Sequence, residues 1–284
     1  MANTNAPTGF SQNNGVASQT YEMVQVAIAS TNTSPIFAGD PVAQLSTGYI
    51  GALPVSGTSI TVTGASGTGA VATLTYSSIA AANVPPVGST VVVSGLTSTG
   101  VGYNGIWTVT ASSQTSLSYA SAATGTYVAG GTIVGYVPIL GVFVCCEYLS
   151  TSQKKKVWNN YWPGADAAAD VTAWIISDPD AVYSVQTANS NTTATAVGLA
   201  NIGQNINFSY GSGGNTASGL SGAYADQYTI ATSPYLPFRI IGLANYTPGG
   251  VTPFLSISGN DYTSAYNKIL VRANYAVQNT LFGI

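Results

Sequence analysis

The chain has 284 residues, of which only 5% are charged, with no histidine, two cysteines and a formal net charge of −3. Gly, Ala, Ser, Thr and Val dominate, and no stretch rich in Glu, Lys and Leu predicts a long helix. The sequence contains no basic stripe that would bind nucleic acid and no apolar run near the ~20 residues that span a bilayer. We therefore expect neither nucleic acid nor a membrane as a partner.

Residues 1–20 show no hydrophobic periodicity and include Pro7 and Gly9 among polar neighbours, which predicts an extended arm. The start lacks the basic and apolar segments of a signal peptide, so we expect a protein made in the cytoplasm without processing. We expect the arm to dock on its own subunit or on a neighbour, with Phe10 and Tyr21 as candidate contact residues.

The stretch between Asp40 and Glu147 contains no charged residue. It holds short β-patterned runs separated by Gly, Ser, Pro and Asn turns, which predict a small β-sandwich. These runs are 59–64, 70–76, 89–96, 105–111, 115–120 and 130–137.

The edges of this sandwich are marked by Pro54 and Pro138. Without the residues between them, the β runs at 39–50 and 138–149 would be joined by a short turn. A domain inserted at an exposed hairpin tip has this pattern. We therefore predict an inserted domain at 53–137 in a discontinuous host domain made of 1–52 and 138–284.

The host domain also has a β pattern, and several of its runs alternate small or polar residues with large apolar ones. The predicted strands are 21–30, 41–45, 139–149, 155–162, 171–177, 181–187, 205–210, 236–244, 254–258 and 268–277. The predicted fold is all-β, with a β-barrel or barrel-like sandwich as host. The chain ends in an apolar cluster that includes Leu281 and Phe282, which are candidate contact residues.

Catalytic and metal-binding patterns are missing from the sequence. The lack of histidine removes the commonest general base and every Ser-His or Cys-His nucleophile. Asp178 with Asp180, or Asp166 with Asp170, could act on glycosides, but Asp178 and Asp180 flank a proline and favour a turn. No loop of alternating acids predicts calcium binding, and we expect no enzyme activity, cofactor or metal.

The two cysteines, Cys145 and Cys146, are adjacent in an apolar run. On a strand their side chains point to opposite faces and cannot bridge each other, so we expect both to be buried and reduced.

The segment 145–164 combines lysines with aromatic residues. On a strand, Lys154 and Lys156 would share one face. The segment can be a solvated turn whose lysines protect a strand edge, or a contact with an acidic protein surface. In the second case the buried anchors would be Trp158, Tyr161 and Trp162.

Several stretches, taken together and in order, resemble tailed-bacteriophage head decoration or capsid cement proteins. They are MANTNAPTGF, IFAGDPV, ILGV, WIISDPDAVYSVQ, LPFRIIGL and KILVRANYA. The run PVGSTVVVSGLTSTGVGYNGIWTVT separately resembles the Ig-like, adhesin-like domains of phage structural proteins. Where that family often carries arginines after its opening pattern, this chain has Ser11, Gln12 and Asn13, so no charge contact is carried over to the arm.

The resemblance implies a structural virion protein on the outer surface of the capsid. Its partners would be the major capsid protein and itself, as a homotrimer. The alternative is a tail or fibre component whose Ig-like domain contacts the host cell surface.

Overall fold

The computed structural model describes residues 3–12, 23–45, 47–53, 59–79, 84–85, 87–211, 213–232, 234, 236–244 and 260–279. The predicted all-β class is confirmed. Within these residues, helical structure is limited to two short 3-10 turns, η2 (Leu199–Asn201) and η3 (Val277–Asn279). The chain divides into two compact units: unit 1 is Met1–Leu53 with Pro138–Gly283, and unit 2 is Pro54–Val137 with Ile284.

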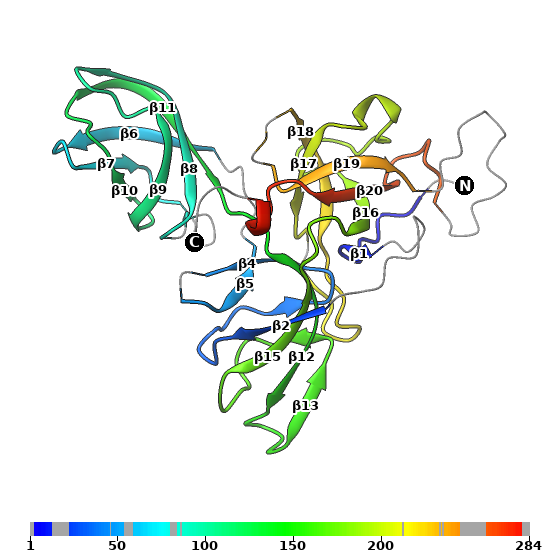
Figure 1. The fold of residues 1–284 in the computed structure, drawn as a ribbon. Coiled ribbons are helices and arrows are strands. Elements are labelled where there is room, and N and C mark those ends of the chain that lie inside the picture. The colour runs from blue at the N-terminus through cyan, green and yellow to red at the C-terminus, as the bar shows by residue number, and fades with distance from the viewer. Residues whose placement is uncertain are drawn as a thin grey trace. The chain divides into compact units, whose positions relative to one another are not determined.

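Unit 2 is a closed antiparallel barrel in the order β10-β7-β6-β11-β8-β9 (Figure 1). Its strands are β6 (Ser59–Gly67), β7 (Val71–Tyr76), β8 (Thr90–Thr99), β9 (Gly105–Ser112), β10 (Ser116–Ala120) and β11 (Thr126–Tyr136). The predicted Ig-like sandwich is not confirmed, because these strands form one continuous ring of pairings.

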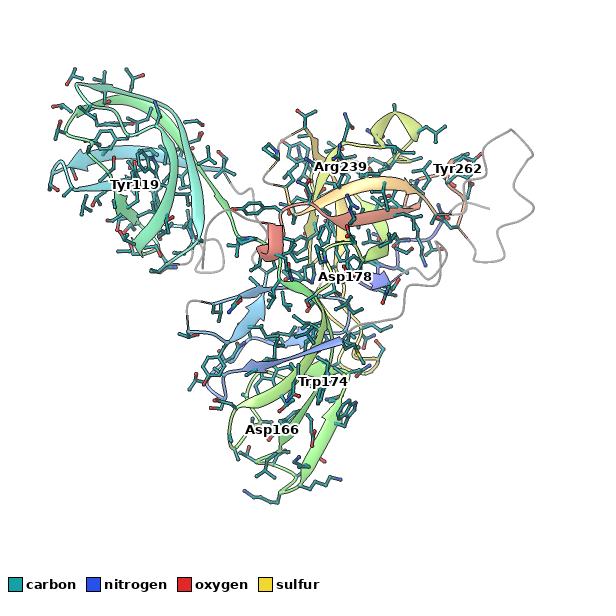
Figure 2. All side chains as sticks on the ribbon, viewed as in Figure 1. Tyr119, Asp166, Trp174, Asp178, Arg239 and Tyr262 are labelled. Atoms are coloured by element: carbon teal, nitrogen blue, oxygen red, sulfur yellow. The ribbon has the colours of Figure 1, made fainter. Side chains whose placement is uncertain are left out.

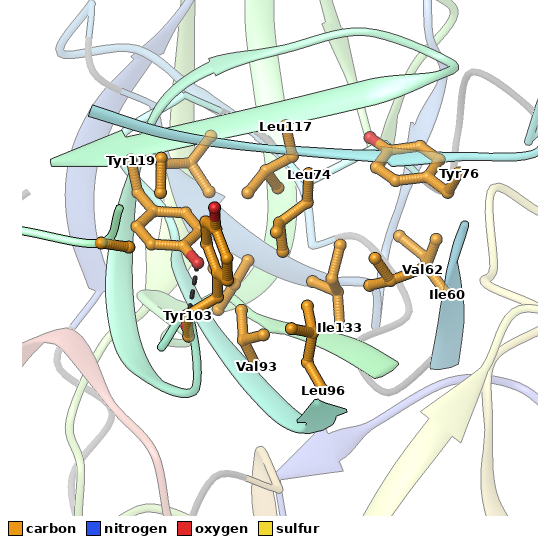
Figure 3. Packing of buried hydrophobic residues seen from close by; sticks show 14 residues of the cluster. Ile60, Val62, Leu74, Tyr76, Val93, Leu96, Tyr103, Leu117, Tyr119 and Ile133 are labelled. Carbon is orange, nitrogen blue, oxygen red and sulfur yellow. Dashed lines mark hydrogen bonds between the residues drawn. The ribbon is translucent and has the colours of Figure 1, made fainter. Parts of the chain in front are cut away.

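The barrel interior of unit 2 is filled by alternate side chains of each strand, as the period-2 pattern of β6 requires. Figure 3 shows Leu74, Leu117 and Ile133 packed together with Tyr119 and Tyr103. The Tyr119 hydroxyl donates to the Tyr103 carbonyl at 2.9 Å, so this buried polar group is satisfied. An apolar core therefore holds a unit that has no charged residue.

Unit 1 contains a second ring of strands, β16-β18-β17-β19-β20, which closes because β20 pairs with β16. Its strands are β16 (Val182–Ala188), β17 (Asn205–Ser209), β18 (Tyr224–Ala231), β19 (Phe238–Leu243) and β20 (Lys268–Ala273). The short strand β1 (Ser11–Gln12) adds to β16. The barrel-like character predicted for the host is therefore present here.

A second sheet of unit 1 has the order β2-β15-β12-β4-β5, with β13 paired to β12. The strands are β2 (Met23–Ile28), β4 (Pro41–Gln44), β5 (Ile50–Ala52), β12 (Gly141–Leu149), β13 (Lys156–Asn159) and β15 (Val171–Ile176). A separate two-stranded sheet of unit 1 pairs β3 (Ile36–Phe37) with β14 (Tyr161–Trp162). Strand β4 lies between β5 and β12, so the chain leaves for unit 2 and returns on opposite sides of β4.

The two sheets of unit 1 meet at Asp40, which is 3% exposed. Its carboxylate accepts hydrogen bonds from the Phe37 N–H (2.7 Å) and from the Ser221 hydroxyl (2.5 Å). Nearby, the buried Tyr210 hydroxyl donates to the Leu53 carbonyl at 2.7 Å. Burial raises the pKa of Asp40 to about 6, and its two hydrogen bonds oppose that rise. This buried carboxylate links β3, β4 and the segment before β18.

Residues 3–12 of the predicted arm dock on unit 1 itself. The Asn3 amide donates to the Asp261 carbonyl at 2.7 Å, and the Gln186 side chain donates to the Thr4 carbonyl at 2.8 Å. Phe10 is 3% exposed and stacks on Phe238 with ring centroids 4.3 Å apart. The arm therefore docks on its own subunit, which is one of the two expected sites. Phe10 is corrected as a contact with the capsid or another subunit, because its ring belongs to the barrel core.

Candidate interaction surface

The turn between β12 and β13 contains the lysines singled out in the sequence. The Ser150 N–H donates to the Lys155 carbonyl (2.9 Å), and the Lys154 N–H donates to the Ser150 carbonyl (3.0 Å). Lys154 has φ of 55°, in the left-handed region typical of turns. Lys154 lies in the turn and β13 begins at Lys156, so the shared strand face that a strand would have given these two lysines does not form.

Asp166 fixes the conformation of this turn. Its carboxylate accepts hydrogen bonds from the hydroxyls of Ser150 (2.5 Å), Thr151 (2.8 Å) and Ser152 (3.0 Å) and from the Ser152 N–H (2.8 Å). These hydrogen bonds, that of Ser150 first, hold the pKa of Asp166 well below its usual value. The lysines are therefore presented on an ordered turn.

A tryptophan pair, the exposed Trp158 and the half-buried Trp174, lies on the sheet beside this turn. Trp158 of β13 is 62% exposed, and its ring lies 4.5 Å from that of Trp174 of β15, tilted by 36°. Figure 2 labels Trp174 and Asp166, which both belong to unit 1. The cross-strand partners on β12 are Glu147 for Trp158 and Leu149 for Lys156.

We call the residues Glu147, Leu149, Lys156, Trp158 and Trp174 the tryptophan face. Leu149 is 47% exposed, and Lys156 forms an ion pair with Glu147 at 2.5 Å. The Lys156 side chain is 76% exposed, so solvent screens this pair and it adds little stability. The face combines apolar area with an already paired charge.

The other predicted aromatic anchors lie deeper in unit 1. Trp162 is fully buried, with its indole N–H donating to the Asn32 carbonyl at 3.3 Å. Tyr161 is half-buried and stacks on Phe37 with ring centroids 5.3 Å apart. The prediction of Trp162 as a surface anchor is corrected, because the β3–β14 pairing turns its ring into the core cluster.

Trp174 was not among the contact residues predicted from the sequence, although the pattern of its strand indicates a side that is only partly covered. In VTAWII, Trp174 shares its side of β15 with the polar Thr172. The other predicted contact residues, Tyr21, Leu281 and Phe282, lie outside the described residues.

Neither Asp166 nor Asp170 has a raised pKa. Asp170 accepts hydrogen bonds from the Tyr49 hydroxyl (2.6 Å) and the Ser30 N–H (3.0 Å), which lower its pKa as the turn lowers that of Asp166. A general acid in glycoside hydrolysis needs a raised pKa. Asp178 accepts from the Asp180 N–H at 2.8 Å, as the predicted turn requires.

Both cysteines are free and buried, as predicted. Burial raises the pKa of the Cys146 thiol to about 12, and it also raises that of Cys145. These thiols therefore act as packing groups on β12.

Within the described ranges, no three His, Cys, Asp or Glu residues gather closely enough to hold a metal ion. The same part of the chain contains no helix long and apolar enough to cross a membrane. No protein-family model, no curated protein and no solved structure matches the chain.

Proposed function

We propose that this chain is a structural virion protein, a head decoration or capsid cement protein. In this role it binds the outer surface of the major capsid protein shell as a homotrimer and stabilises the head. The ordered sequence stretches described above motivate the class of protein. The structural observation that supports the proposal is the exposed Trp158 ring packed against the half-buried Trp174 on a sheet of unit 1.

Tryptophan is enriched among the residues that dominate binding energy at protein interfaces. An indole with 62% of its area in water, supported by a second indole, is suited to insertion into a pocket on a partner. The adjacent Lys154 and Lys155 lie on the ordered turn and favour an acidic partner surface.

The mechanism requires no chemical step. Each subunit covers a junction between capsid proteins, and the trimer engages several such junctions at once. Because linked contacts raise the effective concentration of one another, weak single contacts give strong overall retention. The subunit therefore acts by covering the surface of the capsid shell at these junctions.

Binding to purified capsid shells tests the role of the tryptophan face. The variant Trp158→Ala should lose at least about tenfold in affinity while keeping its fold, because the indole is mostly exposed. The matched control is Tyr228→Ala, which removes an aromatic ring that is 63% exposed on β18. Equal binding by both variants and the wild type would refute the assignment of this face.

The copy number in intact virions tests the class of protein. Gel densitometry should give a number comparable with that of the major capsid protein, and light scattering of the purified chain should give a trimer. A few copies per particle, located on the tail, would instead support the alternative of a tail or fibre component whose unit 2 touches the host cell.

A further inference from the structure

Unit 1 carries two adjoining grooves that have no part in the tryptophan face. The larger has a volume of about 800 Å³ and is lined by Asn5, Asn189, Asn191, Tyr224 and Tyr266 among others. The smaller, of about 380 Å³, shares Asn189 and includes side chains of other polar residues such as Gln227. Residues of the 188–197 segment line both grooves.

The lining of the larger groove has a distinctive chemistry. Its described residues include no charged side chain and no Leu, Ile, Val, Met or Phe. They offer carboxamides and hydroxyls, which both donate and accept hydrogen bonds, and two tyrosine rings. We propose that this groove binds a neutral oligosaccharide, with Tyr224 and Tyr266 contacting the C–H faces of the sugars and the asparagines bonding to their hydroxyls.

The walls of the groove are preorganised. The Asn189 carboxamide oxygen accepts hydrogen bonds from the N–H groups of Asn191 (3.0 Å) and Thr192 (2.8 Å). Below them, the buried Asp226 accepts from the Ser190 hydroxyl at 2.6 Å. A loop fixed in this way loses little entropy when a ligand binds.

Tyr266 is held in a conformation that its residue type disfavours. Its φ is 60°, in the left-handed region, and the Gln186 amide donates to its carbonyl at 3.1 Å. A bulky residue at positive φ costs free energy, and this backbone hydrogen bond helps to hold Tyr266, and with it the ring that lines the groove, in that conformation. In the turn after β17, Gly211 leaves room for the Tyr224 ring, which a Cβ would approach to 3.1 Å.

A peptide fits this groove less well than a sugar does. Peptide recognition depends on apolar anchor pockets or on pairing along a sheet edge, and the lining supplies no large aliphatic side chain. Acidic glycans or phosphate esters would need cations, which are missing from the described lining residues.

Isothermal titration with defined hexasaccharides tests the proposal. The probes are hexamers of β-1,4-glucose, α-1,4-glucose and β-1,4-N-acetylglucosamine, with hexagalacturonate as the acidic comparison and an uncharged hexapeptide as the peptide comparison. At least one neutral hexasaccharide should bind, and neither comparison probe should. Binding of the peptide or hexagalacturonate alone, or of no probe, would overturn the proposal.

Variants of Tyr266 separate binding from folding. Tyr266→Gly removes the ring and relieves the positive φ, so the protein should stay folded while affinity for the neutral probe falls about tenfold or more. Tyr266→Phe keeps the ring and should bind within about threefold of wild type. Unchanged affinity in Tyr266→Gly contradicts the proposed contact.

A second variant tests whether weaker sugar binding comes from lost contacts and not from a change in folding. Asn191 is exposed in the loop, so Asn191→Ala should leave thermal stability unchanged and weaken sugar binding about fivefold. Tyr228→Ala, which lies outside both grooves, should bind the sugar as wild type does. None of these variants touches the tryptophan face, so capsid-shell binding should persist in all of them, and the two proposals can fail separately.

Discussion

Replacing Phe10 by alanine tests whether the N-terminal segment is part of the folded unit. The Phe10 ring stacks on Phe238 at 4.3 Å with an interplanar angle of 16°, and it meets Phe208 and Tyr183 edge-on at 6.1 and 6.5 Å. With 3% of its area exposed, the side chain contributes most of its apolar surface to the core.

The expected magnitude follows from this burial. Truncating a buried phenylalanine to alanine costs about 3–5 kcal/mol through lost transfer free energy and the remaining cavity. We therefore expect the free energy of unfolding of unit 1 to fall by about 4 kcal/mol, which lowers the urea midpoint by roughly 1–2 M.

Tryptophan fluorescence during urea titration measures this change. Three of the four tryptophans, Trp158, Trp162 and Trp174, lie in unit 1, so the signal reports mainly on that unit. The control Tyr228→Ala removes an exposed ring and should change the free energy by less than about 1 kcal/mol. If Phe10→Ala unfolds at the same urea concentration as the wild type, the N-terminal segment is not docked and the reasoning fails.

Four further predictions concern other parts of the chain. Gly9→Ala should lower the melting temperature of unit 1, because φ is 78° and a Cβ would lie 2.6 Å from the Ser221 Cβ. The pKa of Asp40 is raised from 3.8 to about 6, so protonation of this group stabilises the folded state at low pH. The free energy of unfolding should therefore fall by about 3 kcal/mol as the pH rises from about 4 to about 6. Denaturant titrations at several pH values should show that Asp40→Asn removes this dependence. Cys146 should react with a thiol reagent in neutral buffer only after denaturation, since burial raises its pKa to about 12. Replacing 54–137 by about four glycines should leave unit 1 folded by circular dichroism, because β5 and β12 flank β4 only two strand spacings, roughly 10 Å, apart.

Each of these has a contradicting outcome. A Gly9→Ala variant that melts with the wild type would mean that the segment relaxes away from Ser221. A pH dependence that survives in Asp40→Asn would belong to another group. Rapid labelling of native Cys146 would show that its side chain is accessible to solvent. Loss of the unit 1 circular dichroism spectrum after excision would show that unit 1 depends on residues 54–137.

The docking of residues 3–12 on unit 1 limits how a contact between this segment and the capsid shell can be tested. Deleting residues 1–20 would remove Phe10 from the core, so loss of shell binding after that deletion would not distinguish a lost contact from unfolding. Substitution of Trp158, which is mostly exposed, avoids this problem.

Local sequence determined the strand content of the chain. Alternation in 59–64 and 171–177, the Gly and Pro turns, and the scarcity of charge all favour an all-β protein, because period-2 patterns bury one face of a strand whatever its partners. The turn at Asp178–Asp180 and the burial of Cys145 and Cys146 follow from equally local chemistry.

Only the tertiary structure decided which aromatic side chains face solvent. Trp158 and Trp162 occur in one short segment with similar neighbours, yet one is 62% exposed and the other fully buried. Alternation defines two faces of a strand, but distant segments decide which face is covered. Here β3 brings Phe37 onto Tyr161 of β14, and the Asn32 carbonyl accepts from the Trp162 indole. In the same way, β15 brings Trp174 beside Trp158. The burial of Phe10 against Phe238, more than two hundred residues later in the chain, has the same cause.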